Sequence, residues 1–450
     1  MMEAVIPHAQ ASRVEGAARA PLLLAGLALL VVAIALGVSS LTLLKLGINY
    51  GEAGGSLAAK IHPATYLLAV ALVTRIILQR HPARFLIEAG ASHRGTMIFM
   101  WIVASLLAYA AVNLHVPLSS LIDTFIFPIM ALLLLDGIDE RNARLLAFLI
   151  HAIFAANAIL ALVEMASGWR LTPVIALGVD LSVADRRSSA LFGHPLGNAM
   201  LTGLYVTVLS VGGGRDLPSW MRPMALVLQL AAMVSFGGRL ATVTMLGFLV
   251  LATLRTAMRV FSGQRFRIST AASVLGLLPF VIVALLGIYA TGFFDQLLER
   301  FVSDNRSAEA RVVMFELIPR FPLFQLLFGP DQDLLNSLKW TEGIEFGIES
   351  FWVSFVLTYG AVPSLLFFFG FGAFCLDLAR HSGKGAAWAI AYFLIVASGS
   401  LSIGDKTLAF GALVILAMIL LRAPMSRRSQ LSWPRRDGAP EPAMRPEIRD

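Results

Sequence analysis

Arginine and histidine side chains gather in one polar segment of an otherwise apolar chain. Arg186, Arg187 and His194 lie within residues 185–199, and Pro195 follows the histidine directly. Proline is favoured in the first turn of a helix, and helix N-termini attract anions. The guanidinium fork of arginine suits phosphate. The segment therefore indicates an anion site, with anchoring of the arginines in lipid headgroups as the alternative.

Another arginine lies in a short polar stretch between two apolar ones. This stretch runs from Ser235 to Arg239 and includes Gly237 and Gly238. An arginine at a membrane boundary is costly unless it faces water, a partner or a ligand. Arg239 is therefore a further candidate for anion binding, unless it only caps the loop.

A longer polar region carries three more candidates. Arg306 and Arg311 are five residues apart, at the expected start of a helix, and Glu349 opens a later apolar stretch. The arginines are either further phosphate donors or a solvated helix start. A carboxylate that faces a wet cavity can act as a general base. A carboxylate at a helix start can also do no more than complement the helix dipole.

The composition is that of a membrane protein. The 450 residues are 58% hydrophobic and 14% charged, and the mean hydropathy is +0.78. Long apolar stretches recur from about residue 21 to residue 421, which predicts an all-α polytopic membrane protein. The net charge of +7 fits basic cytoplasmic loops better than nucleic-acid binding. The single cysteine, Cys375, excludes an intrachain disulfide and argues against a thiolate metal site.

Apolar windows of about 17 to 25 residues predict about twelve transmembrane helices. With twelve spans, the arginine-rich loops and both termini fall on one side, which the positive-inside rule makes cytoplasmic. The expected centres are Ile34, Ala71, Val103, Phe127, Ala155, Leu204, Leu230, Gly247, Val281, Phe355, Leu394 and Val414. The basic residues that orient the bundle are Arg80, Arg84, Arg94, Arg141, Arg144, Arg215, Arg222, Arg255, Arg259, Arg265, Arg267, Arg380 and Lys384.

This topology divides the chain into three regions. Residues 1–20 form a cytoplasmic N-terminus, residues 21–421 form the bundle, and residues 422–450 form a disordered basic cytoplasmic tail. The bundle includes two periplasmic loops, 166–192 and 291–347. The larger loop is expected to be partly helical, because its apolar residues recur with helical spacing. Its apolar stretch Phe321–Pro330 is expected to lie in the membrane interface.

These segments, in this order, resemble the O-antigen polymerase and O-antigen ligase superfamily, which includes the Wzy-type polysaccharide polymerases. The resemblance covers about residues 186–360. It is carried by Arg187 before Gly193-His194-Pro195, by the Ser235-x-x-x-Arg239 hairpin, and by the large loop that ends before Tyr359-Gly360. Ligases of the superfamily typically carry a histidine near the end of that loop, where this chain has Glu349 and no histidine. The resemblance therefore favours a polymerase of a secreted or capsular polysaccharide.

The resemblance also implies a place, a substrate and roles for the candidate residues. It implies a multi-pass protein of the bacterial inner membrane that transfers an undecaprenyl-pyrophosphate-linked glycan to a hydroxyl of another lipid-linked repeat unit. Transfer takes place on the periplasmic side, without cofactor or metal. The expected partners are membrane lipids, a chain-length regulator and a flippase, and no nucleic acid. Arg187, His194, Arg239, Arg306 and Arg311 are expected to bind substrate, and Glu349 to act as base. The alternatives are a ligase of the same superfamily and a transporter or flippase of lipid-linked oligosaccharide.

Overall fold

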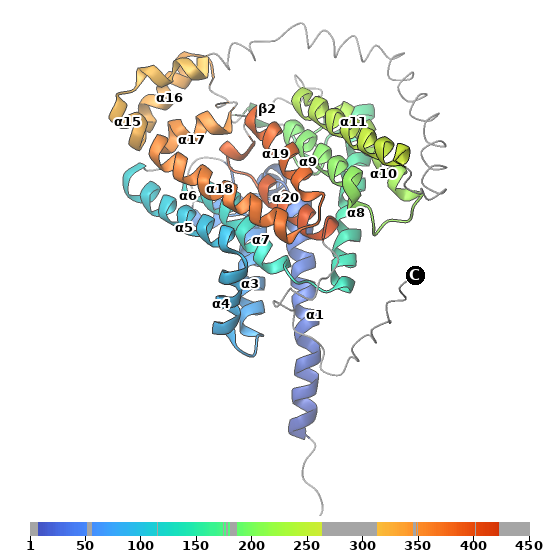
Figure 1. The fold of residues 1–450 in the computed structure, drawn as a ribbon. Helices are drawn as coiled ribbons and strands as arrows, with labels where there is room; N and C mark the ends of the chain where they lie inside the picture. The colour runs from blue at the N-terminus through green and yellow to red at the C-terminus, as the bar shows by residue number, and fades with distance from the viewer. Residues whose placement is uncertain are drawn as a thin grey trace, which may run out of the picture.

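The described part of the chain is almost entirely helical (Figure 1). The structure is a computed structural model that describes residues 8–51, 56–114, 116–173, 175–176, 179–180, 187–262, 313–344, 348, 350–400 and 402–422. Within these residues the only sheet is a two-stranded antiparallel ribbon, in which β1 (Ile175–Ala176) pairs with β2 (Val179–Asp180). The expected all-α architecture is confirmed.

Five helical segments are long and apolar enough to cross a membrane, and five shorter apolar helices accompany them. The long segments are Arg94–Leu114, Leu118–Leu135, Glu140–Ser167, Pro195–Gly213 and Ala361–His381. The shorter ones are Leu22–Gly37, Pro63–Ile77, Met221–Phe236, Ala386–Ser398 and Ala409–Leu420. A membrane protein is therefore supported, whereas the number of twelve spans stays a prediction. The expected ninth span, centred on Val281, lies outside the described residues.

The helices follow one another in the order that the apolar pattern predicts. The first half of the chain contains α1 (His8–Gly37), α2 (Ser40–Lys45), η1 (Leu57–Lys60), α3 (Pro63–Ile77), α4 (Pro82–Ser92), α5 (Arg94–Tyr109), η2 (Ala110–Leu114), α6 (Leu118–Leu121), η3 (Ile122–Ile126), α7 (Phe127–Leu135), α8 (Glu140–Ser167), α9 (Pro195–Val208) and η4 (Leu209–Gly213). The second half contains α10 (Met221–Phe236), α11 (Arg239–Phe261), η5 (Ile318–Arg320), α15 (Leu323–Phe328), α16 (Gln332–Thr341), α17 (Phe351–Tyr359), α18 (Ala361–His381), α19 (Ala386–Ser398), η6 (Ser402–Gly404) and α20 (Ala409–Leu420).

Helices α9 and α20 form the centre of the bundle. Every residue of α20 is buried, and so is almost every residue of α9, because these helices are apolar on all sides. Phenylalanine rings join α5, η3, α17 and α18 beside them. Phe99, Phe125, Phe355 and Phe367 lie with ring centroids 4.3–6.2 Å apart in pairs, a spacing typical of aromatic packing.

The two ends of the bundle differ in charge. At one end, which we call the basic end, Arg422 forms ion pairs with Glu140 and Asp216 at 3.0 and 2.8 Å. Arg215 donates to the carbonyl of Arg422, and Arg144 pairs with Glu140 at 3.1 Å. The opposite end holds the turns between α1 and α3 and between α19 and α20 (Figure 1). The arginine-rich loops at residues 136–144 and 214–220 therefore share one end with the last described residue of the chain.

The tenth expected span differs from the prediction. Gly360 has φ +89° and divides the window centred on Phe355 into α17 and α18. A Cβ at this glycine would lie 2.4 Å from the amide nitrogen of Gly329. Phe351 lies against Phe371, with ring centroids 5.8 Å apart, so α17 folds back along α18. The long apolar helix here is α18, which is centred about one third of its length beyond the break.

The described part of the large loop is a folded layer, as expected. Met314, Leu317, Phe321 and Leu335 are buried in a second, smaller core that also includes Leu357 of α17. The apolar face of α15 stays outside this core, and the side chains of Leu323 and Phe324 are each 73% exposed. This exposed apolar pair fits the expected interfacial position.

Candidate functional site

The loop that leads into α9 rests on a buried carboxylate. Glu164 of α8 is 4% exposed and accepts hydrogen bonds from the amides of Ser189 and Ala190, each at 2.9 Å. Its other oxygen accepts from the amide of Leu171 at 2.9 Å. Ala190 has φ +41°, which a non-glycine residue adopts only when its surroundings impose it. Glu164 therefore fixes the backbone of the arginine-bearing loop.

Buried amide side chains complete this support. Asn157 of α8 accepts from the amide of Leu191 at 3.0 Å. Asn198 of α9 donates to the carbonyl oxygens of Ser189 and His194 at 2.6 and 3.0 Å. Both asparagines are fully buried, so they satisfy backbone groups that water cannot reach. Residues 188–194 thus form a rigid turn on the α8–α9 pair.

His194 is the N-cap of α9, as the position of Pro195 predicts. Its Nδ1 accepts a hydrogen bond from the amide of Leu196 at 3.3 Å, and Pro195 occupies the first helical position. A neutral ring that accepts at Nδ1 carries its proton on Nε2, and this atom is then a donor. The side chain is exposed, so it can present this donor at the surface of the loop.

The loop brings two separately predicted arginines to one region. The amide of Ser188 donates to the carbonyl of Ser235 at 2.9 Å, which joins the residue after Arg187 to the end of α10. Gly237 ends α10 with φ +64°, and Arg239 is the first residue of α11. A Cβ at Gly238 would lie 2.4 Å from the Cβ of Ala199, so α9 packs directly on this turn. Arg187 and Arg239 are both half-buried beside the start of α9.

Four other candidate residues cannot be placed. Arg186, Arg306, Arg311 and Glu349 lie outside the described residues. The described neighbour of the glutamate, Ser350, is the N-cap of α17. The roles of these four residues stay predictions.

A pocket of about 100 Å³ adjoins the loop and contains a lysine that the sequence analysis missed. Leu191 and Phe192 line one wall, Ser39 and His62 line another, and Lys406 completes it. A Cβ at Gly193 would lie 2.5 Å from the Oγ of Ser39, so the loop also packs on the turn before α2. The pocket therefore joins the arginine-bearing loop to the turn between α19 and α20.

Lys406 is held over an aromatic ring. Its Nζ lies 3.5 Å from the ring centroid of Tyr50 and donates to the carbonyl of Tyr50 at 2.8 Å. Partial burial lowers the pKa of Lys406 to about 8, and the charge of Lys60 lowers it further, whereas Asp123 and Asp405 oppose the change. The lysine therefore carries a positive charge at neutral pH and loses it at moderately alkaline pH.

Asp123 organises the floor under Lys406. It is fully buried and accepts hydrogen bonds from the hydroxyls of Tyr50 and Thr65 at 2.9 and 2.6 Å. It also accepts from the amide of His62 at 3.0 Å. His62 itself donates from Nε2 to the carbonyl of Val38 and accepts at Nδ1 from Ala64. Burial lowers the pKa of His62 to about 4, and the charge of Lys406 adds to this, so His62 is neutral at physiological pH.

A signal for Lys406 was present in the sequence. The lysine lies between the last two apolar stretches, in a turn that the expected topology places on the same side as Arg187. A basic residue there departs from the positive-inside rule in the same way as the arginines do. We overlooked it because the turn is short and contains Asp405, which reads as a simple surface ion pair.

Among the described residues, one group has the side chains to hold a metal ion. It consists of His93, Asp377 and His381, and it lies near the basic end, away from Arg187 and Arg239. It therefore belongs to no part of the candidate anion site.

Comparisons with known proteins give no relative. No protein-family model matches the chain, and no curated protein or solved structure is significantly similar to it.

Proposed function

We propose that this protein is a polysaccharide polymerase of the bacterial inner membrane. It transfers a glycan from undecaprenyl pyrophosphate to a hydroxyl of another lipid-linked repeat unit, on the periplasmic side. The observation that carries the proposal is the meeting of Arg187, His194 and Arg239 on the rigid turn at the start of α9. A preorganised set of cationic and N–H donors is what a pyrophosphate leaving group requires.

The reaction needs two kinds of group. The acceptor oxygen attacks the anomeric carbon, the bond from that carbon to the phosphate oxygen breaks, and the electron pair stays on the pyrophosphate. Arg187, Arg239 and Lys406 stabilise the charge that develops there, together with Arg306 and Arg311. The proton of the attacking hydroxyl passes to Glu349. Direct displacement inverts the anomeric centre, and the chemistry needs no cofactor or metal.

The proposed orientation rests on charge. Arg144, Arg215 and Arg422 share the basic end of the bundle, which we assign to the cytoplasm together with both termini. The anion site then faces the periplasm, where lipid-linked repeat units are polymerised. The exposed apolar pair on α15 is placed to contact the outer leaflet.

Binding of undecaprenyl pyrophosphate tests the site directly. The purified protein in nanodiscs should bind undecaprenyl pyrophosphate more tightly than undecaprenol, because the arginines recognise the phosphates. An Arg187→Ala, Arg239→Ala double variant should lose this preference, whereas Arg144→Ala at the basic end should keep it. Equal binding of both lipids by the wild-type protein would contradict the assignment.

The same preparation separates polymerase from the alternative functions. A flippase moves the intact donor across the bilayer and forms no glycosidic bond. A ligase accepts a lipid A core and not a second repeat unit. Release of free undecaprenyl pyrophosphate with repeat units as the only acceptor is expected of a polymerase alone.

A further inference from the structure

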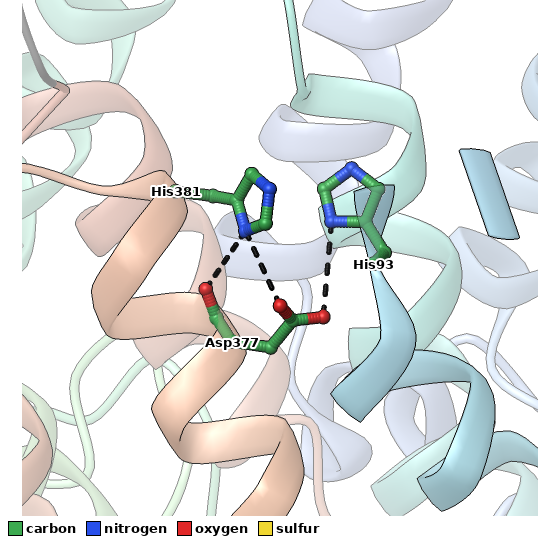
Figure 2. Close-up of side chains that lie close together, drawn as sticks. All are labelled: His93, Asp377 and His381. Atoms are coloured by element: carbon green, nitrogen blue, oxygen red, sulfur yellow. Dashed lines mark hydrogen bonds and ion pairs between the residues drawn. The ribbon is translucent and has the colours of Figure 1, made fainter. Parts of the chain in front are cut away.

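We propose that His93, Asp377 and His381 bind a divalent transition metal of the zinc class near the basic end of the bundle (Figure 2). One ligand atom from each residue lies within 4.8 Å of the others. A tetrahedral zinc ion with bonds of about 2.0–2.2 Å places neighbouring ligand atoms about 3.4 Å apart. The three side chains therefore need only small rotations to close around an ion.

His93 is oriented as metal-binding histidines usually are. Its Nε2 lies 3.2 Å from a carboxylate oxygen of Asp136 and donates to it. The lone pair of Nδ1 is then directed toward Asp377, whose Oδ2 is 3.9 Å away (Figure 2). The residue is fully buried, and its Nδ1 has no hydrogen-bond partner within the described structure. A carboxylate behind the imidazole fixes the tautomer that leaves Nδ1 free for a metal.

His381 approaches the carboxylate of Asp377 from the other side. Its Nδ1 lies 2.9 Å from the carbonyl oxygen of Asp377 and 3.5 Å from Oδ1 (Figure 2). Donation from Nδ1 to the carbonyl leaves the lone pair of Nε2 available. The His381 side chain is 21% exposed, so an ion can enter beside it and a water molecule can complete the coordination.

Asp377 is held in place for both histidines. Its Oδ2 accepts from the amide and the hydroxyl of Thr96 at 3.0 and 2.7 Å. Two carboxylates, Asp136 and Asp377, thus surround two imidazoles in a mostly buried cluster. The charge nearby comes from Arg75, which donates to the carbonyl oxygens of Leu134 and Asp136 at 2.8 Å each. A divalent cation neutralises the two carboxylates while both imidazoles stay uncharged.

The metal would connect segments that are far apart in the sequence. His93 precedes the first residue of α5, and Asp377 and His381 belong to the last two turns of α18. Gly95 shows how closely these helices pack, because a Cβ there would lie 2.3 Å from the carbonyl oxygen of Ala373. The ion would fasten the crossing of α5 and α18, and its role is structural and independent of the proposed transferase site.

Metal content and thermal stability test this proposal. The full-length protein, purified with an affinity tag that contains no histidine, is treated with chelator and dialysed against Zn²⁺ or Co²⁺. About one equivalent of metal per chain and an increase in Tm on adding Zn²⁺ are expected. The Co²⁺ form should show the visible absorption of a tetrahedral site with nitrogen and oxygen ligands.

Variants assign the metal to these residues. His381→Gln should reduce the bound metal to less than about a fifth and abolish the Tm response, because a carboxamide is a poor zinc ligand. His81→Ala, at an exposed histidine before α4, is the matched control and should bind as the wild type does. Wild-type protein that binds no metal, or a His381→Gln protein that binds as much as the control, would overturn the proposal. A His93→Gln variant with unchanged content would do the same.

Discussion

At the residue scale, the candidate site depends on fixed positive charge. Arg187 and Arg239 come from segments about fifty residues apart in the sequence, yet one backbone hydrogen bond from Ser188 to Ser235 joins them. Lys406 reaches the same region through the pocket that it shares with Leu191. Charges that are already in place cost no reorganisation when the leaving group forms.

Replacement of Arg187 or Arg239 by alanine should lower turnover by about 10²–10³-fold, the usual effect of removing one preorganised donor. Lysine at either position should restore activity only in part, because a point charge lacks the bidentate fork. Polymer per unit of protein is measured after expression in cells that supply lipid-linked repeat units. Arg144→Ala is the control, and normal polymer from both alanine variants would remove these arginines from the site.

Lys406 gives the site a pH dependence. Its pKa is lowered to about 8, so its charge is present at neutral pH and is lost as the pH rises through about 8. Affinity for undecaprenyl pyrophosphate should therefore fall by about tenfold between pH 7 and pH 9, since a hydrogen bond to a charged group contributes about 1.5–3 kcal/mol. The contribution of this lysine to stability runs the other way. Folding disfavours its protonated form, so stability rises with pH between about 8 and the unfolded value near 10.4.

A Lys406→Arg variant separates this effect from other titrations. Arginine stays charged over the whole range, so the affinity of this variant should be nearly constant from pH 7 to pH 9. The same loss of affinity in the variant as in the wild type would show that another group titrates. His62 is excluded from this window, because its pKa of about 4 keeps it neutral throughout.

At the element scale, the buried polar side chains of α8 and α9 hold the loop that carries Arg187. Glu164 accepts three backbone amides, and a glutamine can accept with only one of its two terminal atoms. Glu164→Gln should therefore lower the stability by about 2–3 kcal/mol, since each charge-assisted bond contributes about 1.5–3 kcal/mol. The decrease is read from the Tm in detergent.

The matched control for this variant is Glu88→Gln. Glu88 pairs with Arg84 at 2.6 Å, but this pair lies on the surface of α4, where such pairs contribute about 0–1 kcal/mol. Its Tm should stay close to that of the wild type. An equally small effect of Glu164→Gln would mean that the loop does not depend on the carboxylate.

The sequence predicted helices better than it predicted breaks and buried polar groups. The N-cap at His194 and the turn before Arg239 follow from proline and glycine at known positions. The break at Gly360 was missed, because apolar residues continue on both sides and only the close approach of Gly329 shows why a glycine is needed. Glu164 was missed for another reason. Its partners lie in a loop beyond the end of its own helix, and no local pattern reveals a contact of that kind.

At the scale of the whole molecule, the account requires two ends with opposite roles. Cysteine labelling tests this in a Cys375→Ala background, because Cys375 is the only native cysteine. Ser337→Cys, on the exposed face of α16, should react with a membrane-impermeant maleimide in intact spheroplasts. Arg144→Cys, at the basic end, should react only after the membrane is permeabilised. The reverse pattern would place the anion site in the cytoplasm and contradict the polymerase.

Glycosyl transfer by the purified protein is the most direct test of the central claim. Wild-type protein in nanodiscs is supplied with lipid-linked repeat units, and both glycan length and free undecaprenyl pyrophosphate are measured. Each new glycosidic bond should release one molecule of undecaprenyl pyrophosphate, and the Arg187→Ala, Arg239→Ala double variant should release almost none. Donor that crosses a liposome bilayer intact, with no release of undecaprenyl pyrophosphate and no longer glycan, would contradict the account and favour a flippase.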